Sequence, residues 1–338
     1  MKIPTLLAVV LTAVTTQVGA EDNAQSCVMG YFSSGEGAMT LADVRKACPT
    51  AEQELSIAKN EVEAAISKRG SISNRFINEK KTEFNQYVLT PHKLNYLLPA
   101  ITTNRINKEA YRSLNGYEEN LEHIESKFQL SLKVPLNNDS LLIEGDALYI
   151  GFTLQAWWQI YADGISKPFR ETNYQPEVFY LAPLDWQPFA GNTGFIVGLE
   201  HQSNGRGQGL SRSWNRFYTH FLFEKDNFAL SLKPWLRLSE EKKTFALDPE
   251  GDDNRDIEDF MGNFELGLVY KWNELELSFK GRQNFDTHYG AAEVGLTFPL
   301  WGRLRGYATG FNGYGESLID YNYSQTRFGI GISLNNVL

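Results

Sequence analysis

The feature that most constrains this chain is a period-two alternation of apolar and polar residues, repeated over long segments in its last three quarters. In residues 128–134, phenylalanine, leucine and valine fill the even positions, and glutamine, serine and lysine fill the odd ones. Residues 228–233 alternate in the same way. Successive side chains of a strand point to opposite faces, so each such segment is expected to be a β-strand with one apolar face. The pattern therefore predicts an all-β fold.

Strand length and connection length narrow the fold further. We expect about 12 strands, many of them reaching the roughly 9–11 residues that cross a bilayer at a tilt. Their expected ranges are 92–103, 122–136, 146–161, 172–183, 192–203, 214–225, 227–238, 260–273, 274–284, 290–300, 302–314 and 325–337. Long connections, such as 104–121, alternate with tight ones, such as 226–227.

Two architectures fit alternating strands. A soluble sandwich or barrel turns its apolar faces inward, whereas a membrane barrel turns them outward. Short turns that alternate with longer loops are typical of the membrane type. The sequence therefore predicts a transmembrane antiparallel β-barrel of about 12 strands, whose inward charges, such as Lys133 and Lys233, form a network in a narrow, partly hydrated lumen. No stretch stands out as a plug for that lumen.

The N-terminal region predicts export. Residues 1–20 combine a lysine, an apolar run and a small-residue end, which is typical of a cleavable signal peptide. We expect residues 21–90 to form a small periplasmic segment with some helix, and residues 91–338 to form the barrel. The expected location is the bacterial outer membrane, as a multi-pass protein.

Both cysteines, Cys27 and Cys48, fall in the N-terminal segment. An exported chain meets an oxidising compartment, so we expect a Cys27–Cys48 disulfide, with two reduced, buried thiols as the alternative. Thr50 and Gln53 resemble a capping box, and apolar residues follow at helical intervals.

The net charge argues against one class of partner. The formal charge is -9, and the chain has no basic tract. Nucleic acid is therefore not an expected partner.

One hairpin, residues 199–218 (LEHQSNGRGQGLSRSWNRFY), holds three residues suited to acyl transfer: His201, Ser203 and Asn215. A serine hydroxyl needs a base within hydrogen-bond reach, and the base needs a third group to orient it. His201 and Ser203 share one face of a strand, and the returning strand supplies Asn215. The alternative interpretation is a polar hairpin tip that contains a histidine by chance.

The phase of the apolar alternation along this strand favours the catalytic interpretation. Phe195, Val197 and Leu199 form an apolar stripe, and His201 and Ser203 continue it on the same face. If both ends of the barrel domain lie in the periplasm, odd strands run outward, and the fifth strand carries this pair to the cell-surface end. Their phase places them on the lipid-facing exterior, where lipid is the accessible substrate.

The loop of the same hairpin is rich in oxygen. A hard cation such as calcium takes six to eight oxygen ligands, including carbonyls and waters. The polar residues of the loop and its flanks are Ser203, Asn204, Arg206, Gln208, Ser211 and Ser213.

The segment HQSNGRGQGLSRSWNR resembles the active-site motif of the bacterial outer-membrane phospholipase A family. The resemblance runs from about residue 90 to the C-terminus. It implies that His201 is the base, Ser203 the nucleophile and Asn215 the orienting amide. It also implies that Arg206 and Ser211 contribute to a calcium site.

A second stretch, residues 157–180, resembles the S-x-P-F-R-E-T-N-Y segment of that family. There Ser166 falls where a partner subunit donates a calcium ligand. The resemblance implies a calcium-dependent enzyme that hydrolyses membrane phospholipids, of the phospholipase A1/A2 and lysophospholipase type, active as a homodimer. We expect a backbone N–H near Gly205 to serve as an oxyanion donor. The alternative function is a non-enzymatic porin or structural barrel.

Overall fold

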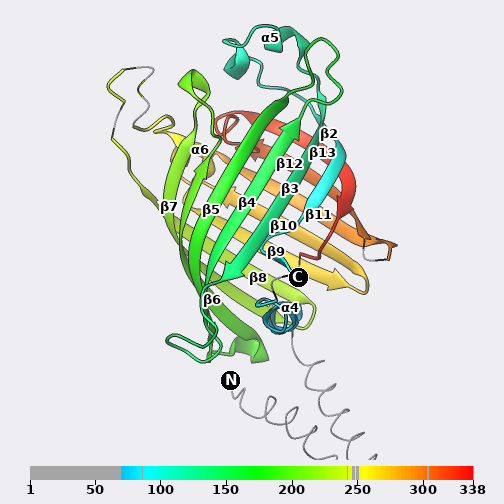
Figure 1. The fold of residues 1–338 in the computed structure, drawn as a ribbon, viewed down its shortest axis with the longest axis vertical. Coiled ribbons are helices and arrows are strands. Elements are labelled where there is room, and N and C mark those ends of the chain that lie inside the picture. Colours follow the sequence, from blue (N-terminus) through cyan, green and yellow to red (C-terminus); the bar gives the residue numbers. More distant parts are fainter. Residues whose placement is uncertain are drawn as a thin grey trace, which may run out of the picture. The chain divides into compact units, whose positions relative to one another are not determined.

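Twelve long antiparallel strands close into one barrel (Figure 1). Each strand pairs with its neighbours in sequence, and β13 pairs with β2, which closes the sheet. A two-residue strand, β1 (Thr90–Pro91), is added to β3. The long strands are β2 (Tyr96–Thr103), β3 (Ile124–Pro135), β4 (Ala147–Trp158), β5 (Phe169–Leu184), β6 (Asn192–Ser203), β7 (Ser213–Lys225), β8 (Phe228–Leu238), β9 (Phe264–Trp272), β10 (Leu275–Gln283), β11 (Gly290–Trp301), β12 (Leu304–Tyr314) and β13 (Ser324–Ser333).

The computed structural model describes residues 70–337 except 86, 242, 246–247, 249–250 and 303. The expected signal peptide, the Cys27–Cys48 disulfide and the helix after Thr50 lie outside the described residues. Residues from Gly70 onward form one unit. The short helices of this unit are α4 (Ser71–Lys80), η1 (Glu109–Tyr111), α5 (Tyr117–Asn120), η2 (Pro188–Ala190), η3 (Gln208–Leu210) and α6 (Ile257–Met261).

The predicted fold class is confirmed, and most strand ends agree with the prediction within a few residues. The largest differences occur where apolar alternation runs into a loop. The sequence predicts that a strand begins at residue 260, but Ile257–Met261 form helix α6, and β9 begins at Phe264. Ile257 and Met261 are buried and lie four residues apart, a spacing that puts them on one face of a helix.

Burial shows that the apolar faces point outward. In β3, Ser131 and Lys133 are buried at 0% and 5% exposure, whereas Leu130 and Val134 are 49% and 58% exposed. This is the reverse of a soluble protein, and it is the pattern that a barrel surrounded by lipid requires. Among the described residues, no helix is long and apolar enough to cross a membrane.

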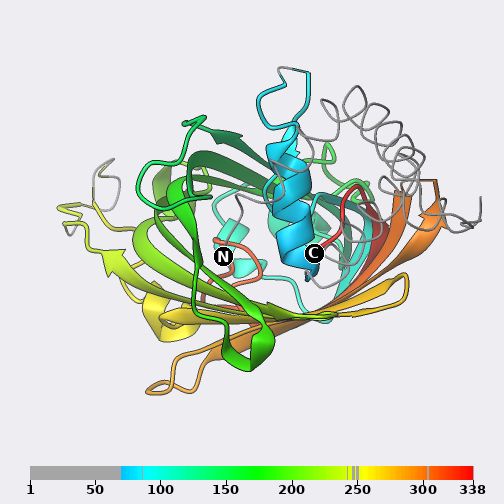
Figure 2. The same cartoon turned by 90° about the horizontal axis from the view of Figure 1, so that it is seen from below.

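At one end of the barrel, α4 lies across the opening, as the view from below shows (Figure 2). The Glu224 carboxylate at the end of β7 accepts hydrogen bonds from the N–H groups of Ile72 (2.7 Å) and Ser73 (3.0 Å). These are orphan donors of the first helical turn, where a negative charge is also favoured by the helix dipole. At the other end of α4, Glu79 pairs with Lys133 at 2.7 Å. Helix α4 is thus fixed to the barrel by contacts with side chains that point inward.

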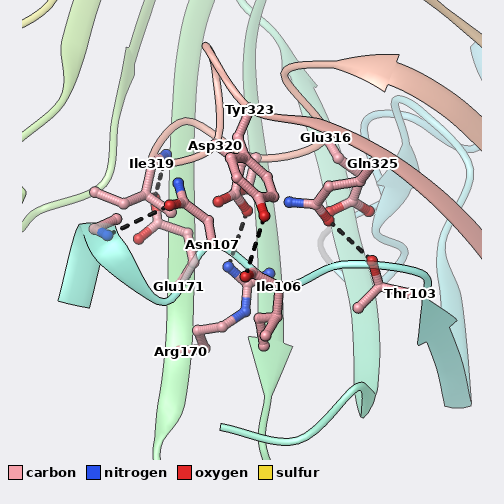
Figure 3. Close-up of polar contacts among 12 residues, drawn as sticks. Thr103, Ile106, Asn107, Arg170, Glu171, Glu316, Ile319, Asp320, Tyr323 and Gln325 are labelled. Carbon is pink, nitrogen blue, oxygen red and sulfur yellow. Dashed lines mark hydrogen bonds and ion pairs between the residues drawn. The ribbon is translucent and has the colours of Figure 1, made fainter. Parts of the chain in front are cut away.

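At the opposite end, the connection between β12 and β13 packs into the barrel. Its residues 316–321 are all buried. Arg170 of β5 donates to Asp320 of this connection at 2.9 Å, and the main chain of Ile319 donates to Glu171 (Figure 3).

This network continues into the barrel wall. Arg170 and Arg327 both pair with Glu125, and Arg327 also pairs with Glu316 at 2.9 Å. All four side chains are at most 7% exposed. No stretch of the sequence stands out as a plug, yet residues 316–321 are buried inside one end of the barrel and α4 lies across the opening at the other (Figure 2). Both segments have ordinary composition, and their partners lie far away in sequence.

We expect Glu224→Gln to loosen α4. The substitution removes the charge that faces the helix N-terminus and weakens two charge-assisted hydrogen bonds, so amide exchange at residues 72–76 should rise by about tenfold. Hydrogen–deuterium exchange read by mass spectrometry measures this. Glu144→Gln, an exposed glutamate in the β3–β4 turn, is the matched control. Equal exchange in the two variants would contradict this role of Glu224.

Candidate active site

The hairpin of β6 and β7 brings His201 and Asn215 together. They are direct register partners, and Ser203 pairs with Ser213 two residues nearer the loop. His201 Nδ1 lies 2.8 Å from Asn215 Oδ1. The amide oxygen can only accept, so Nδ1 carries the proton and Nε2 is left as the basic nitrogen. Ser203 lies two residues from His201 on the same face of β6, as the sequence predicts.

This face is the outside of the barrel. Glu200, on the other face, is 2% exposed, whereas Leu199 and Phe217, on the His201 face, are 54% and 37% exposed. His201, Ser203 and Asn215 are half-buried. They lie at the end of β6 that is remote from α4, because Asn192 at its start bonds to Glu224 beneath that helix. The three residues therefore lie on the lipid-facing side, at the end of the apolar stripe.

The inner face of the hairpin is held by a buried aromatic and charged cluster. Trp214 Nε1 donates to Gln202 Oε1 at 2.9 Å, which turns Gln202 inward between His201 and Ser203. The Arg216 guanidinium stacks on Trp214 at 3.9 Å and pairs with Glu200. Gln202 and Glu200 are thereby fixed on the inside, which holds the neighbouring residues on the outside.

Asn204 organises the loop between the two strands. Its Nδ2 donates to the Leu210 carbonyl at 2.8 Å, and its Oδ1 accepts from the N–H groups of Arg206 (3.2 Å) and Arg212 (3.0 Å). The side chain is only 3% exposed. From the sequence, Asn204 is expected only as one of the oxygen-bearing residues of the loop, and this role is not predicted. An asparagine before a glycine at the start of a turn was the available signal.

Gly205 adopts φ +62°, a left-handed conformation that favours glycine. A Cβ atom here would lie 3.1 Å from Cε2 of Tyr174, which is the register partner of Ser203 on β5. The glycine therefore lets an aromatic ring pack against the loop beside Ser203.

The predicted calcium ligands lie on two loops at the same end of the barrel. Arg206 and Ser211 belong to the β6–β7 loop, and Ser166 is exposed in the β4–β5 loop. The Arg206 guanidinium connects the two, since it donates to the carbonyls of Phe169 (2.8 Å) and Arg170 (2.9 Å).

The donor set fits calcium in kind. It consists of a carbonyl and hydroxyl groups, the oxygen ligands that a hard cation accepts. Within the described part of the chain, no group of three or more His, Cys, Asp or Glu side chains could hold a metal ion. A calcium site here would thus depend on neutral oxygens and water.

Comparisons with known proteins identify the family. The family model described as Phospholipase A1 matches residues 72–334. The chain belongs to the phospholipase A1 family. Phospholipase A1 of Salmonella typhimurium is 41% identical over 287 residues, which cover 84% of this chain and 93% of that protein. Phospholipase A1 of Escherichia coli K12 is 40% identical over 279 residues, which cover 82% and 91%.

Solved structures agree with this assignment. Outer membrane phospholipase A from Escherichia coli, in an active-site mutant form, aligns with a TM-score of 0.71 and 38% identity over 78% of this chain and 98% of that one. The Salmonella typhi enzyme, a dimer with bound calcium, gives the same TM-score with 39% identity and the same coverage. This member of the phospholipase A1 family is therefore a phospholipase and an outer-membrane β-barrel protein. The non-enzymatic alternative is excluded.

We expect Asn204→Ala to release the β6–β7 loop of this phospholipase. Loss of three hydrogen bonds made by this side chain should raise amide exchange at residues 205–212 by about tenfold or more, while β6 and β7 remain protected. Exchange mass spectrometry of the refolded barrel checks this. Asn312→Ala removes an amide that bonds Thr326 on the exposed surface of β12, and it serves as the control. Unchanged loop exchange in Asn204→Ala would show that the loop is held by other contacts.

Proposed function

We propose that this phospholipase hydrolyses the acyl ester bonds of glycerophospholipids, with phospholipase A1, A2 and lysophospholipase activity, through Ser203, His201 and Asn215. The observation that supports this most is the 2.8 Å contact between His201 Nδ1 and Asn215 Oδ1 on the outward face of the barrel. The Escherichia coli relative supports it too, because the described active-site mutant replaces an asparagine with alanine.

The chemistry follows from the roles of the three residues. Ser203 Oγ attacks the ester carbonyl carbon while His201 Nε2 takes its proton, and the acyl group transfers to the serine. His201 then gives the proton to the oxygen of the departing lysophospholipid. A water molecule, deprotonated by His201, releases the fatty acid from Ser203 in the same way. Asn215 keeps the imidazole in one tautomer and one orientation throughout.

Stabilising the oxyanion is the second requirement. The backbone N–H near Gly205 is the expected donor within the chain. The Arg206 carbonyl and the Ser211 hydroxyl are the groups that would hold calcium on the same loop. When bound there, calcium supplies positive charge near the developing oxyanion.

The site's position defines the substrate. With the α4 end in the periplasm, the Ser203 end of β6 lies at the cell surface, at the depth of the outer leaflet. Leu199 and Phe217 extend an apolar surface below it, on which an acyl chain can lie. The substrate would thus reach Ser203 from the membrane rather than from the lumen.

Dimerisation completes the calcium site in this proposal. A carbonyl and a hydroxyl are two neutral ligands, too few to hold calcium tightly. Ser166, exposed on the neighbouring loop, adds a hydroxyl when it reaches the site from a second copy. The Salmonella typhi relative, whose crystal structure is a dimer with bound calcium, supports this arrangement. Calcium and dimer would then stabilise each other, as linkage requires.

We expect Ser203→Ala and His201→Ala each to abolish ester hydrolysis, and the double variant to be no worse than either single one, because the residues act as a unit. Hydrolysis of phospholipid in detergent micelles, with heat-modifiable migration as a check of folding, measures this. Ser140→Ala, an exposed serine in the β3–β4 turn at the other end of the barrel, should keep its activity. Turnover in a folded Ser203→Ala protein would point to another nucleophile.

We expect a calcium chelator to shift the enzyme toward monomer and to remove activity. Ser166→Ala should weaken calcium binding of the dimer by about tenfold and leave the monomer unchanged, since the hydroxyl acts across the interface. Light scattering in detergent, combined with calcium titration, separates the two states. Ser239→Ala, an exposed serine at the same end of the barrel, is the control. A fully active monomer would contradict the dimer mechanism and leave the roles of Ser203 and His201 intact.

A further inference from the structure

A carboxylate stands behind the orienting amide. Glu240 follows the end of β8, and its Oε1 accepts a hydrogen bond of 2.6 Å from Nδ2 of Asn215. Strand register explains the contact, because Leu238, two residues earlier, is the direct partner of Asn215. Leu236 and Leu238 are 67% and 47% exposed, so Glu240 continues the lipid-facing side of β8.

We propose that Glu240 is a positioning residue of the active site, which holds the Asn215 amide in one orientation and places a negative charge behind it. The proposal rests on the function proposed above for Ser203, His201 and Asn215. It extends that site to a third strand: β6 supplies the base and nucleophile, β7 the amide, and the end of β8 the carboxylate.

The first part of the role is orientation. The two ends of an asparagine amide have nearly the same size, so shape alone does not fix which end faces His201. An ionised carboxylate only accepts hydrogen bonds, and Glu240 therefore requires the NH₂ group of Asn215 on its side. The amide oxygen is then left to face His201 Nδ1, at 2.8 Å. A flipped amide would place its NH₂ group against the N–H of His201 Nδ1. Two donors would then face each other, and the hydrogen bond that orients the imidazole would be lost.

The second part is charge. When His201 takes the proton from Ser203, the imidazole becomes positive, and an amide carries no net charge to balance it. Glu240 supplies a negative charge one hydrogen bond further away. A hydrogen bond to an ionised acceptor is stronger than a neutral one and polarises the amide toward a more negative oxygen. The hydrogen-bonded series from Glu240 through Asn215 to His201 thus stabilises the positive imidazole in part. In other serine hydrolases a carboxylate does this by direct contact with the histidine.

The position of Glu240 agrees with this role. An ionised group on the lipid-facing side of a barrel is costly unless it is paired or lies near the interface. Glu240 is half-buried, and it is placed where an apolar residue would extend the stripe of Leu236 and Leu238. The bond to Asn215 offsets part of that cost. A purely structural alternative is that Glu240 only ties the end of β8 to β7.

Two substitutions separate these roles. Glu240→Gln keeps an oxygen that accepts from Asn215 but loses the charge, and kcat should fall by about tenfold with KM unchanged. Glu240→Ala also loses the orientation, and kcat should fall by up to about 100-fold. Glu241→Gln removes the same charge from the adjacent, exposed residue and should behave as wild type. A Glu240→Gln enzyme as active as Glu241→Gln overturns the proposal, as does a change confined to KM.

A double substitution gives the sharper test. Asn215→Asp would place a carboxylate within hydrogen-bond distance of Glu240, and two such groups cannot both ionise. The single variant should therefore be poor. Adding Glu240→Gln supplies an N–H donor to the new aspartate, so the double variant should be at least tenfold more active than Asn215→Asp. A double variant no more active than Asn215→Asp would show that residue 240 does not face residue 215 in the active enzyme, and that result overturns the proposal.

The outcomes distinguish this inference from the proposed function. Activity in folded Ser203→Ala would refute the function itself. An inactive Ser203→Ala together with fully active Glu240→Gln would leave the function standing and refute only the role of Glu240. Heat-modifiable migration of every variant shows that the barrel has formed, and Glu240→Gln, which changes no volume, keeps the test valid if Glu240→Ala does not fold.

Discussion

The constraint on which the rest of this structure depends is that a chain surrounded by lipid must satisfy all its backbone hydrogen bonds internally. The pairing of β13 with β2 meets it by removing both edges of the sheet. Once the sheet is closed, each strand has an inner and an outer face, and the outer one must be apolar. The outward position of the apolar face also determines where a protein of this kind can carry out chemistry on lipid. A catalytic pair in the lumen would not meet the membrane, whereas one at the end of the stripe through Leu199 does.

The interior obeys the opposite rule. Charged side chains point inward, and the most deeply buried of them are paired. Glu125 lies between two arginines, Arg170 and Arg327, and all three side chains are about 1% exposed. Burying such groups costs several kcal/mol per ion before pairing. Their arrangement is therefore a consequence of closing the barrel around residues 315–323, which supply Asp320 and Glu316 to the same network.

The sequence predicted what depends on local order. Strand ranges, the outward apolar face and the placement of His201 with Asn215 all follow from a period of two and from the short distance across one hairpin. It did not predict what depends on partners far apart in sequence. Glu224 caps α4 across more than 150 residues, and nothing near either group indicates it. Glu240 was missed for a related reason. It lies two residues past Leu238, the last paired residue of β8, so its contact with Asn215 also depends on how the chain continues beyond the strand.

The choice of an amide beside His201 can be understood from the same lipid-facing position. A carboxylate in direct contact with the histidine would have to remain ionised next to hydrocarbon when the imidazole is neutral, which is most of the catalytic cycle. An amide avoids that cost, but it gives less support to the charged imidazolium. Glu240 lies two residues beyond the register partner of Asn215, toward the barrel end. There its charge is nearer to the polar head groups and is still connected to His201 through a 2.6 Å and a 2.8 Å hydrogen bond. In the proposed site, orientation and charge are thus divided between two side chains, which lowers the cost that the membrane places on a charge beside His201.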